Sequence, residues 1–393
     1  MATQSPEPLE RVQSLDVLRG LALFGMILVH FHVRSAEVPG FDEIVRTLIW
    51  RLVETKSHGT FALLFGAGFA LQLRRAEARD APFVVLYLRR LLVLAVFGFA
   101  AHAFFGFNVL LGYAVWGFAL LFVRNWSTRA LIVTAILSAV SVALFNALSG
   151  VYTQASAGPE ATLAATRAQR ALAQSVHGAL TSAESQASYA VLLSARLHHM
   201  AWFYTRSFFF MPGVTLALFI VGLLAVRHRI FENPRAHTSG IACMMVFGFV
   251  SWLGANWVFP SSLTAALFGL VRDQWLTFTY VGAALLLFAY RPQVLTRLRI
   301  VGTAGRMALT NYLAQIAVLD LLFSGYALGL APIRPVLVPI ATIALFAALT
   351  AFSVAWLRAF RFGPAEWLWR VLTYGQVVPL RRKSWTAIEN AAA

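Results

Sequence analysis

Two residues of the first apolar segment have a spacing that places them on one face of a helix. In the stretch SLDVLRGLALFGMILVH, Arg19 and His30 are eleven residues apart. At about 100° and 1.5 Å per residue, that separation is three turns plus about 20° and about 16 Å of axial length. Asp16 lies three residues before Arg19, on nearly the same face. The helix thus carries either a cation and a deep titratable base for chemistry, or a terminal ion pair and a histidine that hydrogen-bonds to another helix.

His102, Asn108 and Tyr113 form a second group of polar residues in apolar surroundings. His102 ends an apolar segment, and the other two follow it across a turn rich in Phe and Gly. A histidine and an asparagine that face each other across a hairpin would orient a catalytic water or an acceptor hydroxyl. A histidine near a membrane surface is also found as an interfacial side chain with no chemical role. Both interpretations stay open for His102.

The stretch GRMALTNYLAQ carries the third group. Arg306 lies at the start of an apolar segment, and Asn311 and Gln315 are one helical turn apart within it. Their amides would either line a polar cavity or hold neighbouring helices together. Further on, Glu366 and Arg370 are spaced for an i, i+4 pair in an aromatic segment, which predicts a structural helix at the membrane surface.

The residue pattern does not indicate a metal site. Cys243 is the single cysteine, so an intrachain disulfide and a cysteine-based metal site are excluded. His198 and His199 are adjacent, and neighbours on a helix point about 100° apart, which disfavours a shared metal. The sequence contains no phosphate-binding glycine loop, nucleophile elbow or zinc-protease motif. We therefore predict no metal cofactor.

The elements that must position these residues are membrane helices. Of 393 residues, 59% are hydrophobic and 12% are charged. Soluble globular proteins carry roughly 45–50% apolar and about 25% charged residues. This composition excludes an ordinary cytosolic enzyme, a disordered chain and a coiled coil. It predicts an all-α fold, a polytopic integral membrane helical bundle that forms a single membrane domain over 1–393.

About ten apolar segments are long enough to cross a bilayer, which takes roughly 17–25 residues. The loops between them hold about two arginines and lysines on one side for each one on the other, so the positive-inside rule places both termini in the cytoplasm. The net charge of +16 is explained in this way, without nucleic acid. The predicted spans are 15–33, 57–73, 84–104, 107–123, 130–149, 204–226, 240–259, 271–290, 305–325 and 335–357.

Two segments between the predicted spans differ from short connecting loops in composition or periodicity. Residues 150–198 are rich in Ala, Gln and Ser, and would form either external surface helices or a disordered loop. Residues 42–55 place apolar side chains at helical spacing, which predicts an amphipathic helix at the membrane interface. The composition does not fix an oligomeric state, and a homo-oligomer stays open.

With these residues in view, the chain resembles the YeiB-like family of bacterial inner-membrane proteins from end to end. FALLFGAGFALQLRRA, YLRRLLVLAVFGFAAH and NVLLGYA are similar to the family's second to fourth spans. GRMALTNYLAQ and FGPAEWLWRVLTYG resemble its C-terminal signature, which covers 229–386 here. Phe107-Asn108 stands where the family usually has Gly-Asp, so an acidic role there is not expected. The first span often ends in Asn in the family, whereas this chain has His30.

That histidine makes the first span look like the first span of the wider transmembrane acyltransferases, and more distantly like that of the lysosomal heparan glucosaminide N-acetyltransferase. The resemblance implies a helical bundle around a pore that admits an acyl donor, acyl-CoA, from the cytoplasm. Arginine suits the donor's phosphates because its planar fork binds their oxygens bidentately. The residues expected to hold the donor are Arg19, Arg89, Arg90, Arg306 and Asn311.

The same resemblance implies roles in the transfer of an acyl, most simply an acetyl, group. His30, or His102 from the other side, would take the proton from an acceptor hydroxyl or amine. Asn108 or Asn311 would donate to the thioester oxyanion. The residues expected to contact the acceptor, a small molecule or a glycan, are Asp16, Tyr113 and Gln315.

Two other functions fit the composition. A transporter or exporter of a small amphipathic molecule would also place polar groups between helices, although Asp320 is the best of few candidate acids inside the spans. A non-catalytic protein that binds a lipid or a quinone is the second alternative. Membrane lipids are the expected partners in every case.

Overall fold

The computed structural model describes residues 13–207, 212–254 and 274–382. Within these ranges the chain forms helices and no β-strand, and its extended segments meet only at two isolated bridges. The prediction of an all-α fold is confirmed for this part of the chain.

Four of the described helical segments are long and apolar enough to cross a membrane. They are α1 (Gln13–Val33), α4 (Phe83–Phe105), η4 with α9 (Pro234–His237 and Thr238–Leu253) and η6 with α15 (Pro335–Leu337 and Val338–Ala359). Shorter apolar helices accompany them: α5 (Leu110–Val123), the start of α6 (Thr128–Glu184), α8 (Pro212–Arg227), α11 (Trp275–Tyr290) and α14 (Ala308–Phe323). These helices support a polytopic membrane protein. The number of ten spans and the side of the termini stay predictions.

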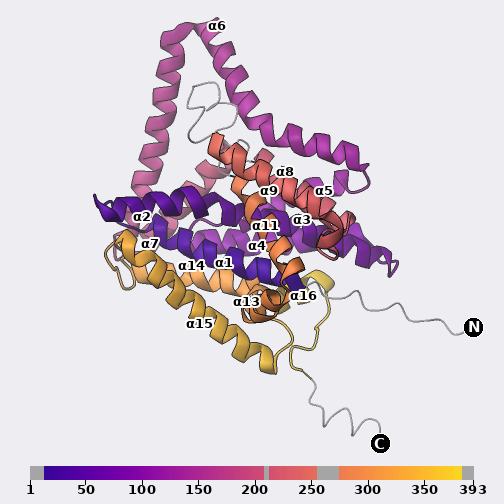
Figure 1. The fold of residues 1–393 in the computed structure, drawn as a ribbon. Helices are drawn as coiled ribbons and strands as arrows, with labels where there is room; N and C mark the ends of the chain where they lie inside the picture. Colours follow the sequence, from indigo (N-terminus) through magenta and orange to yellow (C-terminus); the bar gives the residue numbers. More distant parts are fainter. Residues whose placement is uncertain (1–12, 208–211, 255–273, 383–393) are drawn as a thin grey trace, which may run out of the picture.

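Helix α1 is the most enclosed of the four long helices. In its apolar window 78% of the residues are buried, against 22% in α4 and 28% in the segment ending with α15. It packs against α3 (Thr55–Glu77), α13 (Arg299–Arg306), α14 and α15, and Figure 1 shows it in the middle of the bundle. A Cβ at Gly305 of α13 would overlap the carbonyl oxygen of Asp16, so the two helices touch through their backbones. Most polar groups of α1 therefore face other helices.

Several predicted spans begin or end elsewhere in the structure. Helix α5 begins at Leu110, not at 107, because residues 106–109 form the turn after α4. The predicted span 305–325 is broken at Met307, where α13 ends and α14 begins. The predicted span 204–226 starts in the short helix η2 (Phe203–Ser207) and continues as α8, with 208–211 outside the described residues. Residues 255–259 and 271–273 of two further predicted spans also lie outside them.

Residues 150–198 are helical along most of their length. Helix α6 runs from Thr128 to Glu184 with a bend at Gly158, whose φ of 80° is a backbone conformation that only glycine adopts readily. Figure 1 shows α6 as two arms that project from the rest of the bundle and meet at that bend. Helix α7 (Tyr189–Trp202) then returns to the bundle and contacts α4. Surface helices describe this segment better than a loop.

Residues 41–54 form the helical element predicted for 42–55. Helix α2 (Phe41–Ile49) exposes Phe41, Ile44 and Leu48, and continues as the short π-helix η1 (Trp50–Glu54). Its buried Asp42 accepts hydrogen bonds from Arg334 and from the backbone N–H of Val336, which fasten α2 to η6. Because the exposed face is apolar, it suits a membrane interface.

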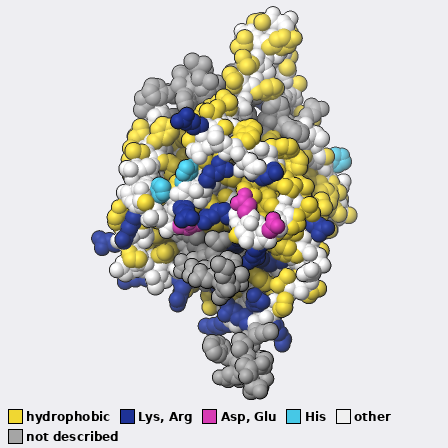
Figure 2. All heavy atoms as spheres, turned by 90° about the vertical axis from the view of Figure 1, so that its right-hand side faces the viewer, with side chains coloured by type: hydrophobic (Ala, Val, Ile, Leu, Met, Phe, Trp, Pro, Cys, Tyr) yellow, Lys and Arg dark blue, Asp and Glu magenta, His cyan; other side chains and the backbone are white. Residues whose placement is uncertain are grey.

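The remaining helices lie at the end of the bundle where α1 begins. These are α12 (Pro292–Arg297), α13 and α16 (Pro364–Tyr374). Figure 2 views the molecule from that end and shows many arginine and lysine side chains among few acidic ones, bordered by apolar side chains. This concentration of positive charge is what the positive-inside rule predicts for a cytoplasmic face.

Candidate membrane-embedded site

His30 lies half-buried in the last part of α1 and faces α14. Its Nδ1 is 3.4 Å from Nε2 of Gln315, and its ring centroid is 6.0 Å from that of Tyr312. His58 and Arg34 lie within electrostatic range of it. The histidine of the first predicted group and the glutamine of the third are thus neighbours, although 285 residues separate them.

The side of α14 that faces His30 carries a buried polar row. Asn311 and Gln315 are fully buried. The amide nitrogen of Asn311 donates to the carbonyl of Ala304 at 3.0 Å and to the hydroxyl of Ser353 at 2.8 Å. The amide oxygens of Asn311 and Gln315 have no hydrogen-bond partner among the described residues. Buried acceptors without donors are costly, so a donor that reached these two oxygens would lower the free energy of the site.

Two tyrosine hydroxyls form hydrogen bonds at the first turns of α3 and α5. The backbone N–H of Val109 donates to the Tyr312 hydroxyl at 3.3 Å. The Tyr113 hydroxyl donates to the carbonyl of His58 at 2.8 Å. Tyr312 and Tyr113 therefore hold the surroundings of His30 in place, and Tyr113 reaches it only through His58.

Asn108 is buried and bonded to backbone on both sides of its amide. Its nitrogen donates to the carbonyl of Gly98 at 3.0 Å, and its oxygen accepts from the N–H of Leu110 at 3.1 Å. These bonds close the turn between α4 and α5. Both ends of the amide are occupied in this way, which places Asn108 in a structural position next to Val109.

His102 belongs to a separate cluster in the last turn of α4. It is 1% exposed, and its ring centroid lies 5.9 Å from that of His199 on α7. His199 in turn lies 5.1 Å from His177 on the second arm of α6. The structure therefore groups His102 with these two histidines and not with His30, while His198 is exposed.

The predicted arginines gather at the other end of α1. A guanidinium nitrogen of Arg19 is 3.2 Å from a carboxylate oxygen of Asp16, and the Arg19 side chain is 28% exposed. Arg90 lies 3.6 Å above the ring of Trp369 on α16, and the charge of Arg19 acts on it. Arg306 ends α13, which packs on the first half of α1, whereas Arg89 is exposed. Arg19 and Arg90 therefore form one basic corner, with Arg306 on the adjoining helix.

Sequence reasoning missed three residues of this site. His58, Tyr312 and Ser353 were not singled out, although each is a polar side chain within an apolar helix. A polar side chain inside a membrane helix is costly to bury, and that cost is the signal by which each of them could have been found. Which of them meet in space depends on how α1, α3, α14 and α15 pack, and the chain alone does not reveal it.

Glu366 has a role that differs from the i, i+4 pair predicted for it. One carboxylate oxygen accepts from the N–H groups of Leu309 and Thr310 at 2.7 and 3.1 Å, and the other accepts from the Thr310 hydroxyl at 2.5 Å. It thereby caps the start of α14 from α16. Burial raises the pKa of Glu366, although these hydrogen bonds oppose the rise.

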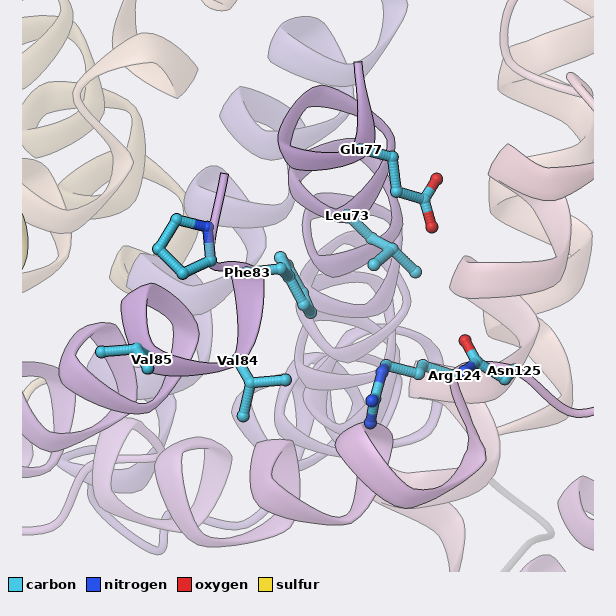
Figure 3. Close-up of a pocket in the computed structure, with 8 residues that line it drawn as sticks. Leu73, Glu77, Phe83, Val84, Val85, Arg124 and Asn125 are labelled. Carbon is cyan, nitrogen blue, oxygen red and sulfur yellow. The ribbon is translucent and has the colours of Figure 1, made fainter. Parts of the chain in front are cut away.

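A small pocket lies among the helix ends near the start of α4. Its volume is about 310 Å³. Figure 3 shows Leu73 and Glu77 on α3, Phe83 at the start of α4, and Arg124 and Asn125 after α5 around it. It contains none of the residues of the His30 site. The described ranges also hold no group of three His, Cys, Asp or Glu side chains arranged for a metal ion.

Comparison with known proteins identifies the family. The model described as "Protein of unknown function (DUF418)" matches residues 225–376. The "Uncharacterized protein YxaH" of Bacillus subtilis (strain 168) is 32% identical over 400 residues, which cover 95% of this chain and 97% of that protein. The chain belongs to the DUF418 family. The "Uncharacterized protein YeiB" of Escherichia coli (strain K12) is 26% identical over 399 residues, 96% of this chain and 100% of that protein, which confirms the YeiB-like resemblance.

A second family model matches the N-terminal part of this DUF418 chain. It is described as "Heparan-alpha-glucosaminide N-acetyltransferase, catalytic" and covers residues 11–158. That range contains α1 to α5, and with them Arg19, His30 and His58. The likeness to a transmembrane acetyltransferase family is therefore found in the helices that carry the half-buried histidine. No solved structure matches the chain.

Proposed function

We propose that the protein is a membrane acyltransferase that moves an acetyl group from cytoplasmic acetyl-coenzyme A to a hydroxyl or amine acceptor. The observation that carries the proposal is the match of an acetyltransferase catalytic model to residues 11–158. This segment supplies both Arg19 at one end of α1 and His30 near the other. The buried amides that face His30 from α14 add the polar surroundings that such a reaction needs.

The basic corner is suited to the phosphates of the donor. Arg19 is partly exposed and held by Asp16, and Arg90 is held flat against Trp369. Two guanidinium groups fixed in this way lose little freedom when they bind phosphate oxygens. Arg306 on α13 and the exposed Arg89, next to Arg90 on α4, add positive charge. The pantetheine arm would then run along α1 toward His30.

His30 is the proposed general base, and Gln315 is proposed to set its tautomer. An amide oxygen and nitrogen are exchanged by a half-turn of the side chain, and the Gln315 oxygen has no partner in the described part of the chain. With that oxygen accepting from Nδ1–H, the Nε2 lone pair of His30 is available to the acceptor. Asn311 and Asn108, whose amide nitrogens donate to neighbouring groups, hold the site together.

The proposed transfer accounts for each bond that forms or breaks and for the proton that moves. His30 Nε2 removes the proton from the acceptor hydroxyl or amine as the acceptor atom attacks the thioester carbonyl. The C–S bond breaks, the acetyl group stays on the acceptor, and the thiolate of coenzyme A takes the proton from His30. The Tyr312 hydroxyl accepts from Val109 N–H and keeps its own proton to donate, so we assign it the stabilisation of the oxyanion.

The test is thioester consumption by purified protein. Acetyl-coenzyme A and a set of hydroxyl and amine acceptors are supplied, and free thiol and acetylated product are both measured. We expect His30→Ala to lower kcat by about 10²-fold or more, the usual effect of losing a general base. The matched control is His198→Ala, at an exposed histidine of α7, which should keep wild-type turnover. Equal turnover in both variants, or no acetylated product with the wild type, contradicts the proposal.

A further inference from the structure

A second concave site lies where α1 ends, outside the residues that the proposed function uses. Its volume is about 500 Å³, which is within the range of small-molecule sites. The walls come from the end of α1, the segment that follows it, α2 and η1. We call it the His32 pocket, after the residue that α1 contributes; the other side chains that matter for its chemistry are Glu37, Glu43, Arg46, Trp50 and Glu54.

The charge of the His32 pocket is opposite to that of the chain. The chain carries 32 basic and 16 acidic residues, yet three carboxylates and one guanidinium line this pocket. Glu37 is 2.7 Å from Arg46, and Glu54 is 3.8 Å from His32. Glu43 adds a further negative charge from an exposed position on α2. A cation is therefore attracted into the pocket, and an anion is repelled.

Two ring systems complete the lining. Trp50 is 45% exposed, so part of its indole is open to a ligand. His32 is 8% exposed, and its Nδ1 is buried with no hydrogen-bond partner among the described residues. An aromatic face attracts an ammonium group, and nearby carboxylates attract its positive charge whether or not the group carries N–H donors. The combination suits an organic ammonium better than a hydrated metal ion, because it offers an aromatic face beside the carboxylates.

We propose that the His32 pocket binds an organic ammonium group. Binding requires no acyl donor, so the proposal is independent of acyl transfer. The ammonium group belongs either to a small dissolved amine or to the headgroup of a lipid such as phosphatidylethanolamine. Exposed Phe41, Ile44 and Leu48 on α2 place the pocket at the level of the headgroups, where both are present.

The first experiment compares a cation with its neutral isostere. Choline and 3,3-dimethylbutan-1-ol have the same shape, and each is titrated by calorimetry into purified full-length protein in detergent without acetyl-coenzyme A. We expect saturable choline binding that weakens as salt is added, and at least tenfold weaker binding of the alcohol. Equal affinities, or no saturable choline binding, overturn the proposal.

Substitutions then assign the binding to the His32 pocket. Glu43→Gln and Trp50→Leu should each weaken choline binding about fivefold or more. Glu43 is exposed on α2, so its substitution keeps the fold intact. The matched control is Glu77→Gln, an exposed glutamate at the end of α3, which should keep wild-type affinity. Choline affinity that is unchanged in both pocket variants overturns the assignment.

A final pair of titrations distinguishes the two sources of the ammonium group. Ethanolamine is titrated into protein in nanodiscs of phosphatidylglycerol and in nanodiscs that also contain phosphatidylethanolamine. Weaker apparent affinity in the second set means that the lipid headgroup occupies the pocket and competes. Equal affinity supports a dissolved amine as the ligand. Absence of ethanolamine binding in both sets contradicts the proposal.

Discussion

In the proposed mechanism, Gln315 decides which nitrogen of His30 acts as the base. It is fully buried and lies 3.4 Å from His30 Nδ1 through its amide nitrogen. We predict that Gln315→Leu lowers kcat for acetyl transfer by about 10–100-fold while the KM for acetyl-coenzyme A changes less than twofold, because the proposed site for the donor's phosphates is at the other end of α1. Steady-state kinetics over a range of donor concentrations measures both constants. A rise in KM with kcat unchanged would show that Gln315 binds the donor and does not orient His30.

The buried carboxyl of Glu366 should make the stability of the protein depend on pH. Burial raises the pKa of this carboxyl, so the folded state holds its proton more tightly than the unfolded state does. The stability that it contributes is therefore full below the unfolded pKa of about 4.3 and is lost as the pH rises through the folded pKa. We expect the melting temperature of the wild type to fall relative to that of Glu366→Gln as the pH rises above about 4.3. Thermal melts in detergent at several pH values measure it, and parallel curves would contradict the assignment.

The close contact between α1 and α13 should not tolerate an added side-chain atom. At Gly305 an added Cβ would overlap the Asp16 carbonyl oxygen, which belongs to backbone and cannot turn aside. We expect Gly305→Ala to cost about 1–3 kcal/mol, the usual effect of overpacking, and to displace Arg306. Gly240 on α9 is the control, because a Cβ there meets no atom within 4 Å. Thermal melts compare the two variants, and equal melting temperatures would contradict the close contact.

The sequence predicts helices well and their partners poorly. Apolar runs reveal α1, α4 and α15, because each is long and flanked by charge. The sequence starts this span at 305, within the last turn of α13, because no nearby residue marks the break at Met307; the structure caps α14 with Glu366 from a distant helix.

The residues of the site were likewise predictable within one helix but not between helices. The spacing of Arg19 and His30 follows from one helix and was predictable. The contact of His30 with Gln315, and the separate cluster around His102, are set by packing between helices that lie far apart in the chain. Periodicity shows which face of a helix is apolar, but not which other helix covers that face.

At the scale of the whole molecule, the two ends of the bundle have different chemistry. The end where α1 begins collects arginines around Arg19 and Arg90, and α16 covers it. The opposite end is fastened by a buried ion pair between Arg196 of α7 and Asp320 of α14, whose carboxylate also accepts from Ser324 at 2.6 Å and Tyr326 at 2.8 Å. Because α7 is tied to α14 in this way, the helices at this end are held together, which suits a site that a ligand approaches from the opposite end.

This asymmetry leads to a prediction about orientation. Arginines gathered at one end keep that end in the cytoplasm, so the loop between α3 and α4 should lie inside and the segment after α14 outside. Cys243→Ser removes the single cysteine, and new cysteines are then placed at the exposed positions Arg79 and Ala331. In intact spheroplasts a membrane-impermeant maleimide should label the cysteine at 331 and reach the one at 79 only after lysis. The reverse pattern would place Arg19 and Arg90 outside, away from cytoplasmic acetyl-coenzyme A, and would refute the proposed donor site together with the orientation.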